Sequence, residues 1–329
     1  MSEQYTPAYR ITPGILHSIE QIGEALGNLR AVSDSAVVPV LRRGNRIKTI
    51  QASLAIEGNS LSLEQVTAVL SGKRVLAQPR EIQEVRNAFA AYEKLTEWTA
   101  HSRADLLAAH GLLMAGLVDE IGRFRSGGVG IQRGREVIHI APPAARVPAL
   151  MDNLLAWLEK TDEHPLVASC VFHYEFEFIH PFEDGNGRLG RLWQTLILTR
   201  WRPIFALLPV ESIIHDRQQT YYAALGQADH TGDATSFIEF MLAAILKAIE
   251  ESALAIDQEK TLQKTLQKTP DRIIDLLVQD GRLSIKELAK QIGKSPSAVQ
   301  RILNKLQETQ IIERVGPDKG GHWVVKEKS

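Results

Sequence analysis

The sequence predicts a mainly α-helical protein with one short β-hairpin and a small separate domain in its C-terminal part. Apolar residues recur at three- and four-residue spacing through most of residues 14–258, which is typical of amphipathic helices. Residues 128–140 instead carry β-prone side chains on both sides of a glycine. A polar repeat at residues 260–268 then separates this body from the rest of the chain.

Length and composition indicate a folded protein of more than one domain. The chain has 329 residues, more than one ordinary core holds, and 44% of them are hydrophobic and 23% charged. The single cysteine, Cys170, lies in an apolar run, which excludes an internal disulfide framework and indicates a buried, inert thiol. The chain shows no secretory signal and no apolar run of about 18 residues. We therefore expect no membrane segment and a cytoplasmic location.

The hydrophobic period predicts several helices in the body. Pro165 favours a helix start, because proline suits the first helical position, where no N–H donor is needed. The clearest expected helices cover 105–114, 147–158, from 166 to about 179, from about 187 to 198, and 237–246.

Residues 128–140 break this helical pattern. Gly134 stands between two β-prone runs, as it would in the turn of a hairpin. We expect a short hairpin on the helical body, and the alternative is an irregular loop.

A linker precedes the C-terminal part of the chain. Residues 260–268 repeat the tetrapeptide Lys-Thr-Leu-Gln and lead to a proline, which predicts a helical or flexible linker over residues 251–270. Residues 260–329 carry 14 Lys or Arg and 8 Asp or Glu, a net charge of +6, whereas the remainder carries −7. The C-terminal segment is therefore the part that tolerates a polyanion.

Residues 271–329 have the element order of a winged helix-turn-helix domain. Ser284 and Glu287 are spaced as a capping box, and Gly293 suits the end of the helix that they open. We expect three helices, over 271–277, 285–292 and 296–306, and then two strands, 311–314 and 322–325, around a glycine-rich wing.

The third of these helices would enter the major groove of DNA. Its outward side chains are able to meet phosphates and base edges: Ser295, Ser297, Gln300, Arg301, Asn304 and Lys305. DNA is therefore a candidate partner of residues 271–325, and the alternative is a protein-interaction module of the same shape.

Residues 180–191, His-Pro-Phe-Glu-Asp-Gly-Asn-Gly-Arg-Leu-Gly-Arg, concentrate the chemistry of the chain. His180 offers an imidazole that takes a proton near neutral pH, and Asp184 a carboxylate able to hold Mg²⁺ against phosphates. The glycines let backbone N–H groups point at anionic oxygens where a new helix begins. Two arginines three positions apart suit a polyphosphate. Each feature alone is usually structural, and together they predict a nucleotide site.

The same stretch resembles the signature of the Fic family of AMP-transferring enzymes, His-x-Phe-x-(Asp/Glu)-Gly-Asn-Gly-Arg-x-x-Arg, and matches it at every specified position. The resemblance extends over about residues 14–245 and implies a Fic-type helical bundle. It implies that His180 deprotonates a target hydroxyl, which attacks the α-phosphate of ATP and releases pyrophosphate.

The resemblance also implies the nucleotide contacts. Asp184 would bind Mg²⁺, Asn186 would orient the α-phosphate, and the two arginines would hold the β- and γ-phosphates. The nucleotide-binding residues of this stretch would be Asp184, Gly185, Asn186, Gly187, Arg188, Leu189, Gly190 and Arg191.

Two further segments resemble parts of the family. Residues 221–225 resemble its adenine-side helix, so that Tyr222 would contact the base, with Asp229 as a second candidate. The hairpin at 128–140 corresponds to the family's flap, on which an unidentified target protein would dock by strand addition.

Residues 53–59, Ser-Leu-Ala-Ile-Glu-Gly-Asn, resemble an inhibitory family motif, (Ser/Thr)-x-x-x-Glu-(Gly/Asn). The resemblance implies an inhibitory helix over about residues 46–58, with Ser53, Glu57 and Gly58 as its functional residues. Its Glu57 would pair with Arg191 and exclude the γ-phosphate. Ser53 and Glu57 are four apart and share a helical face. The alternative is that Glu57 merely precedes a helix stop.

We thus expect an N-terminal helical region at 1–98, a catalytic core at 99–250, a linker at 251–270 and a winged helix-turn-helix at 271–329. The leading functional hypothesis is a self-inhibited transferase of AMP to Ser, Thr or Tyr hydroxyls. Removal of AMP from modified proteins, or nucleotide-sensing regulation of transcription, are the alternatives. The phosphotransferases of the related Doc branch are disfavoured because Gly187 is present. A homodimer stays open.

Overall fold

The computed structural model describes residues 5–32, 38–128, 130–133, 136–317 and 321–326. It divides into two compact units, Met1–Leu254 and Ala255–Ser329. The elements that begin in the first unit are α1 (Pro13–Val32), α2 (Val38–Ile56), α3 (Leu63–Leu70), α4 (Pro79–Glu93), α5 (Arg103–Leu113), β1 (Gly130–Arg133), β2 (Glu136–Ile140), η1 (Ala144–Arg146), α6 (Val147–Lys160), α7 (Pro165–Ile179), α8 (Asn186–Trp201), η2 (Pro203–Leu207), α9 (Val210–Asp216), α10 (Gln218–Thr231) and α11 (Thr235–Gln279).

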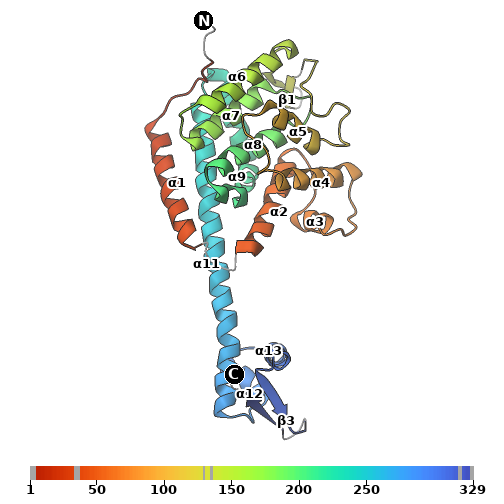
Figure 1. The fold of residues 1–329 in the computed structure, drawn as a ribbon, viewed down its shortest axis with the longest axis vertical. Coiled ribbons are helices and arrows are strands. Elements are labelled where there is room, and N and C mark those ends of the chain that lie inside the picture. The colour runs from red at the N-terminus through yellow and green to blue at the C-terminus, as the bar shows by residue number, and fades with distance from the viewer. Residues whose placement is uncertain (1–4, 33–37, 129, 134–135, 318–320, 327–329) are drawn as a thin grey trace. The chain divides into compact units, whose positions relative to one another are not determined.

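Helix α8 lies in the middle of the first unit, among the other helices of the bundle (Figure 1). Every residue from Arg188 to Thr199 is buried. A helix enclosed on all sides has apolar residues all round, which is why this segment lacks a strong amphipathic period. It nevertheless carries Arg188 and Arg191, which are 5% and 2% exposed. A buried guanidinium needs charged or hydrogen-bonding partners, so these two arginines indicate where a polar site lies in the helical bundle.

Helix α7 packs closely along α8. A Cβ atom on Gly190 would lie 2.8 Å from Glu177 Oε1 and 3.3 Å from the ring of Phe176, so the crossing needs a glycine. Pro165 occupies the first turn of α7, and the His164 ring accepts a hydrogen bond from the Leu166 N–H at 3.2 Å. The helices expected from the hydrophobic period near residues 105–114, 147–158, 166–179 and 187–198 are thus present as α5 to α8.

The first helices place the N-terminal part of the chain against this core. Helix α2 ends at Ile56, two residues earlier than the expected 58, and Gly58 follows it in the left-handed region at φ +92°. The Asn59 N–H then donates back to the Leu54 carbonyl at 3.1 Å. A glycine with positive φ ends a helix at low steric cost, so Glu57 stands on the turn that terminates α2.

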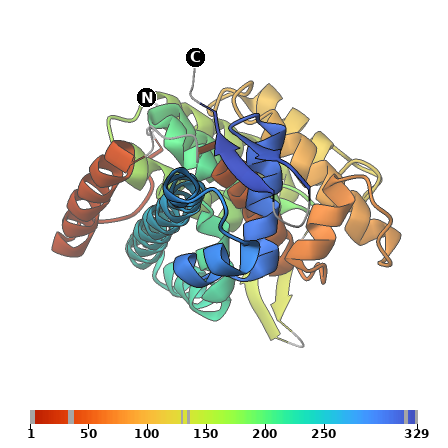
Figure 2. The ribbon, with the colours of Figure 1, turned by 90° about the horizontal axis from the view of Figure 1, so that it is seen from below.

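The β1–β2 pair forms the expected antiparallel hairpin, with Gly130 opposite Ile140 and Arg133 opposite Glu136. The register shifts between Ile131 and Gln132, which is a bulge. The hairpin projects from the helices of the first unit as the yellow strands of Figure 2. The expected turn residue Gly134 lies outside the described residues.

Helix α11 differs from the sequence expectation. We expected a separate helix from residue 271, but α11 runs from Thr235 to Gln279 with Pro270 inside it. A proline inside a helix removes one N–H donor and does not always end the helix, because the hydrogen bonds on both sides of it persist. The expected linker at 251–270 is therefore helical in its backbone.

The C-terminal unit has the expected winged helix-turn-helix elements, α12 (Ile285–Ile292), α13 (Pro296–Glu308), β3 (Ile312–Val315) and β4 (His322–Val325). Ser284 and Glu287 form the predicted capping box, and Gly293 ends α12 at φ +71°. The two strands pair antiparallel, with Ile312 opposite Val325. The predicted fold class, mainly helical with a hairpin and this second domain, is confirmed.

Among the described residues, no helix is both long enough and apolar enough to span a membrane. Cys170 is fully buried, and burial raises the pKa of its thiol to about 12. At such a pKa almost no thiolate forms near neutral pH, which agrees with the inert thiol expected from the sequence.

Candidate active site

His180 caps the C-terminal end of α7 in a left-handed backbone conformation, with φ 48° and ψ 62°. Only His180 and Gln310 combine positive φ with a side chain among the described residues. This region costs a residue with a Cβ atom about 1–2 kcal/mol, so surrounding contacts must hold it. The left-handed conformation turns the chain sharply away from the axis of α7, and the turn occurs at His180, the candidate catalytic residue.

Asn186 holds the loop that follows His180. Its Oδ1 accepts from the Phe182 N–H at 2.9 Å, and its Nδ2 donates to the Phe182 carbonyl at 2.8 Å. The buried amide thereby closes residues 182–186 into a tight turn at the start of α8. In this structure the side chain expected to orient a phosphate serves as the internal brace of the loop.

His110 of α5 contacts the same loop through its ring. Its ring stacks on Phe182 with centroids 3.7 Å apart, and its Nε2 lies 3.0 Å from the Asp184 carbonyl. The Gly122 N–H donates to its Nδ1 at 3.0 Å, so Nε2 carries the proton and donates to Asp184. Burial lowers the pKa of His110, which favours this neutral form.

The N-terminal end of α8 needs glycines for two different reasons. Gly185 has φ +86°, and a Cβ atom there would come 2.6 Å from Met114 Sδ. A Cβ atom on Gly187 would overlap a carboxylate oxygen of Glu57. The first N–H groups of a helix lack intrahelical acceptors and attract anions, so Glu57 lies where an anionic ligand of α8 would lie.

Arg191 donates hydrogen bonds to the end of α2 and to the turn that follows it. Its guanidinium donates to Glu57 Oε1 at 2.7 Å, to the Ser53 carbonyl at 2.9 Å and to Ser53 Oγ at 3.2 Å. Burial by itself disfavours the charged guanidinium, but Glu57, together with Tyr221 and Glu177, favours it, and the pKa of Arg191 lies above its ordinary value. The residues of the inhibitory motif and the second arginine are thus in direct contact.

Arg188 and Asp184 belong to a second ion-pair cluster, closed by α4. Arg188 donates to Asp184 Oδ1 at 2.8 Å and lies 3.4 Å from Glu84 Oε1. Arg80 donates to Asp184 Oδ2 at 3.0 Å. Glu84 also accepts from the Asn59 amide at 2.8 Å, which links this cluster to the residues just after Glu57. Both arginines of the stretch are therefore paired with carboxylates.

Asp184 fits the role of a magnesium ligand by chemistry and exposure. Mg²⁺ is usually held by one or two carboxylates, phosphate oxygens and waters, and the Asp184 side chain is 39% exposed at the entrance of the loop. Within the described residues no three His, Cys, Asp or Glu side chains form a metal cluster. A metal here would depend on the phosphates of a bound nucleotide.

Leu189 and Gly190 occupy the interior. Leu189 is fully buried in the core of the first unit, and Gly190 faces α7. Any contact of these two residues with a nucleotide would come from their backbone, because their side-chain positions lie in the packing between helices.

Tyr222 on α10 touches the inhibitory segment. Its hydroxyl lies 3.3 Å from the Ile56 carbonyl, and Gln218 donates to the same carbonyl at 2.9 Å. This carbonyl belongs to the last turn of α2, where carbonyls lack intrahelical donors. Asp229 lies two turns farther along α10 and accepts from Tyr174 of α7, whose pKa is raised mainly by burial. The candidate base-contact residue Tyr222 thus also holds the end of α2.

A buried hydrogen-bond network joins α7, α8 and α10, with the Glu177 carboxylate of α7 3.8 Å from His173 Nε2. The His173 ring lies 2.7 Å from Gln194 Oε1 through Nδ1 and 3.0 Å from the Tyr221 hydroxyl through Nε2. Burial lowers the pKa of His173 to about 3, so the ring is neutral, with Nδ1 as donor and Nε2 as acceptor.

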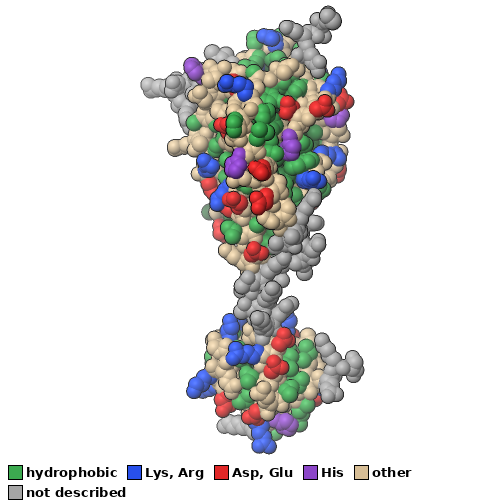
Figure 3. Space-filling model, turned by 90° about the vertical axis from the view of Figure 1, so that its left-hand side faces the viewer, with side chains coloured by type: hydrophobic (Ala, Val, Ile, Leu, Met, Phe, Trp, Pro, Cys, Tyr) green, Lys and Arg blue, Asp and Glu red, His purple; other side chains and the backbone are tan. Residues whose placement is uncertain are grey.

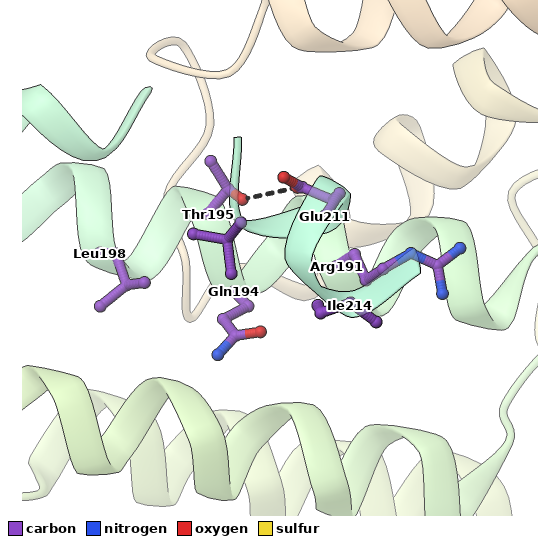
Figure 4. A pocket seen from close by; sticks show the side chains of 7 residues that line it. Arg191, Gln194, Thr195, Leu198, Glu211 and Ile214 are labelled. Carbon is purple, nitrogen blue, oxygen red and sulfur yellow. Dashed lines mark hydrogen bonds between the residues drawn. The ribbon is translucent and has the colours of Figure 1, made fainter. Parts of the chain in front are cut away.

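A small cavity lies beside the aliphatic part of Arg191. Its volume of about 10 Å³ suits a single water molecule. Figure 4 shows Thr195 and Glu211 joined by a hydrogen bond in its wall, while the Arg191 guanidinium extends away from them. Glu211 is buried, also accepts from Tyr92 at 2.8 Å, and burial raises its pKa. Glu211 therefore holds α8 through Thr195 and takes no part in the ion pairs at the N-terminal end of that helix.

Sequence reasoning missed five residues that support the site: His110, Arg80, Glu84, Gln218 and Arg125. His110, Gln218 and Arg125 bind backbone carbonyls far away in the chain, and carbonyls leave no signal in a sequence. Glu84 pairs with an arginine 104 residues away. The spacing of Glu84 to Arg80, one helical turn, was the one available hint of a charged face on α4.

Comparison with known proteins places this arrangement in a family. Residues 100–198 match the Fic/DOC family. A solved Fic family protein from Desulfovibrio desulfuricans G20 is 52% identical, the match covers 99% of each chain, and the TM-score is 0.77. The chain belongs to the Fic family. The predicted membership is thereby confirmed.

Curated relatives of this Fic chain include the protein adenylyltransferase Fic of Aedes aegypti, 29% identical over 68% of this chain and 45% of that protein. The protein adenylyltransferase fic-1 of Caenorhabditis elegans is 30% identical over 69% and 44%. This Fic chain spans about half the length of the curated relatives it matches. A solved Caenorhabditis elegans Fic-1 fragment, 24% identical with a TM-score of 0.59 over 74% of each chain, shares the fold.

The second unit has its own match. Residues 266–313 match the family described as winged helix-turn-helix DNA-binding, which confirms the predicted domain type next to the Fic core.

Proposed function

We propose that this protein transfers AMP from ATP to hydroxyl groups of Ser, Thr or Tyr on target proteins and on itself, and that Glu57 restrains the transfer. One observation carries the proposal. A carboxylate, Glu57, pairs with Arg191 and lies against Gly187 at the N-terminal end of α8, where the complete Fic signature would hold polyphosphate. The names of the curated relatives, protein adenylyltransferases, support the same reaction.

In the proposed reaction, His180 accepts the proton of the target hydroxyl. The hydroxyl oxygen forms a bond to the α-phosphorus of ATP, the bond from that phosphorus to the bridging oxygen of the β-phosphate breaks, and pyrophosphate leaves. Arg188 and Arg191 hold the β- and γ-phosphates, and the N–H group of Gly187 at the start of α8 faces the developing negative charge.

Asp184 would hold Mg²⁺ together with the phosphates, and the ion would supply neutralising positive charge. In this structure Arg80 and Arg188 pair with the Asp184 carboxylate. Their side chains release the carboxylate when phosphates and metal bind.

The restraint follows from competition for one guanidinium. Arg191 is only 2% exposed, and Glu57 is its carboxylate partner at 2.7 Å. A γ-phosphate that needs Arg191 must displace Glu57, which stands on a turn with about a third of its side chain exposed. The hairpin β1–β2 lies beside this machinery in sequence and offers strand edges on which a target segment docks by strand addition.

The test uses the full chain with labelled ATP and a cell lysate, followed by mass spectrometry of the labelled proteins. We expect Glu57→Gly to raise self-labelling several-fold, because Arg191 becomes available to phosphate. His180→Ala is expected to abolish labelling, because no group then accepts the hydroxyl proton. An unchanged rate in Glu57→Gly contradicts the restraint, and undiminished labelling in His180→Ala contradicts the role of the histidine.

The alternative activity is the removal of AMP from modified proteins. It would use the same residues, with Glu57 orienting the attacking water. The observation that favours it is the position of the Glu57 carboxylate directly over α8. Release of AMP from a pre-labelled target, lost in Glu57→Gly, distinguishes this activity from transfer.

A role at DNA is a second candidate, favoured by the family match of residues 266–313. Arg301, Asn304 and Lys305 are exposed on α13, as a recognition helix requires. On the face of this unit in Figure 3, however, Lys and Arg side chains lie beside Asp and Glu. Arg301→Ala and Lys305→Ala are expected to weaken DNA binding, measured by electrophoretic shift at fixed salt, and to leave AMP transfer unchanged.

A further inference from the structure

Arg125 lies in the irregular segment between α5 and β1 and is 3% exposed. Its Nε donates to the His180 carbonyl at 2.7 Å, and its Nη2 donates to the Ile179 carbonyl at 3.3 Å. The same guanidinium donates to the carbonyls of Gly127, at 2.9 Å, and Pro142. All four of these bonds end on backbone carbonyls.

These four carbonyls belong to two parts of the site. Ile179 and His180 form the C-terminal end of α7, while Gly127 lies three residues before β1 and Pro142 two residues after β2. The Arg125 N–H adds a bond to the Pro181 carbonyl at 2.9 Å. One residue therefore ties both ends of the hairpin to the peptide units on either side of His180.

The charge of Arg125 suits this position. The C-terminal end of a helix carries partial negative charge on carbonyls that lack intrahelical donors. A guanidinium presents five N–H donors in a rigid fork, so it satisfies several such carbonyls at fixed angles. Lysine offers a point charge in the same place without the fork.

His180 needs such support, because its backbone is in the left-handed region at φ 48°. A residue with a Cβ atom stays there only when its surroundings fix it. The Arg125 bond to the His180 carbonyl acts on the very peptide unit that is strained.

We propose that Arg125 is a positioning residue, which fixes the strained backbone of His180 and the base of the β1–β2 hairpin with a single guanidinium. Target docking on the hairpin and the aim of the general base are thus set by the same side chain. The inference rests on the proposed function, since it takes His180 as the base. A misplacement of about 1 Å at a reacting group costs on the order of 100-fold in rate.

The test places Arg125→Lys in the full chain carrying Glu57→Gly, with Arg123→Lys as the matched control. Arg123 lies two residues away, and its side chain is 74% exposed. We expect Arg125→Lys to lower kcat about 10- to 100-fold, to leave the KM for ATP within about twofold and to shift the His180 ring signals in histidine-labelled NMR spectra. Hydrogen exchange in the hairpin is expected to rise. Arg123→Lys should match its parent throughout.

The inference is overturned if Arg125→Lys matches Arg123→Lys in kcat and in the His180 signals. It is also overturned if kcat, KM and the unfolding midpoint change together, which marks general destabilisation. Should Arg125→Lys not fold, Arg125→Gln takes its place with the same readouts. If the Glu57→Gly parent transfers no AMP, the proposed function fails, and the His180 signals and the hairpin exchange alone decide the role of Arg125.

Discussion

Two polar networks on α8 differ in their access to solvent: the ion pairs at its N-terminal end have partly exposed partners, whereas the hydrogen bonds of His173 to Gln194 and Tyr221 are buried. At the first site Glu57, Asp184 and Arg80 have 35%, 39% and 53% of their side chains exposed. At the second, His173 and Tyr221 are at most 1% exposed. The two α8 arginines of these pairs are buried and their carboxylate partners are partly exposed, so that under the proposed function an anionic ligand would replace the carboxylates as partners of the arginines. Buried neutral bonds are costly to break, because no water replaces them.

The comparison therefore assigns different tasks to two polar networks on one helix. Under the proposed function, the ion pairs of Arg188 and Arg191 are contacts that a nucleotide would replace. Their carboxylates come from the turn after α2, from α4 and from the loop before α8. The network of His173, Gln194 and Tyr221 holds α7, α8 and α10 in register. Changes in the first are expected to alter activity, and changes in the second to alter stability.

The largest expected effect comes from His173→Phe, which keeps the ring and removes both hydrogen bonds. Gln194 and Tyr221 then lose a buried partner, and the free energy of unfolding should fall by about 2–4 kcal/mol. Urea unfolding at pH 7 measures it. His17→Phe is the control, because His17 is exposed, and it should stay within about 0.5 kcal/mol of the parent. A loss below 0.5 kcal/mol in His173→Phe would remove the distinction between the two networks.

The second effect concerns pH. His173 has a pKa of about 3 in the folded protein, against about 6.5 in the unfolded chain. The unfolded state therefore binds the extra proton, and stability contributed by the neutral ring is complete above pH 6.5 and falls as the pH drops towards 3. Between pH 7 and pH 5 the wild type should lose about 2 kcal/mol more than His173→Gln, which has no titrating ring. Equal losses in urea unfolding at both pH values would contradict the neutral state of His173.

The third effect tests the charged network. In the Glu57→Gly background, Arg191→Lys keeps the charge and loses the fork that matches a phosphate, so the affinity for ATP should fall about tenfold. Calorimetric titration with ATP measures it. Arg202→Lys at the exposed end of α8 is the control and should bind as its parent does. Unaltered affinity in Arg191→Lys would mean that the phosphate does not use this guanidinium.

The smallest effect concerns the hydrogen bond from Gln218 of α10 to the end of α2. Gln218→Ala removes the bond to the Ile56 carbonyl, which loosens the turn that carries Glu57, so AMP transfer by the otherwise wild-type chain should rise about two- to threefold. Gln219→Ala, its exposed neighbour, serves as the control in the same labelling assay. If AMP transfer rises in both variants, or in neither, the bond from Gln218 does not contribute to the restraint, and the Glu57–Arg191 pair alone accounts for it.

Much of this organisation was predictable from the chain, because the signature places its functional groups within twelve consecutive residues. The helices α5 to α8, the hairpin and the capping box at Ser284 follow from local patterns of the same kind. The passage of α11 through Pro270 was not predictable, since a proline is normally evidence for a boundary.

The supporting residues were hidden for a different reason. Arg125 sits in an irregular segment, and its partners are carbonyls up to 55 residues away. Glu84 was one acidic residue among several on α4. The role of such residues depends on which distant segments of the chain fold next to them, and the local spacing of residue types carries no information on that.

Gly187 has one more consequence. A Cβ atom there would overlap the Glu57 carboxylate, and under the proposed function the same hollow has to admit a phosphate oxygen. A larger residue at this position would require the Glu57 carboxylate to shift and, under the proposed function, would crowd the phosphate as well. Under the proposed function, a substitution that relieves the restraint is therefore expected at the end of α2, or at the α10 side chains that contact it, rather than at Gly187.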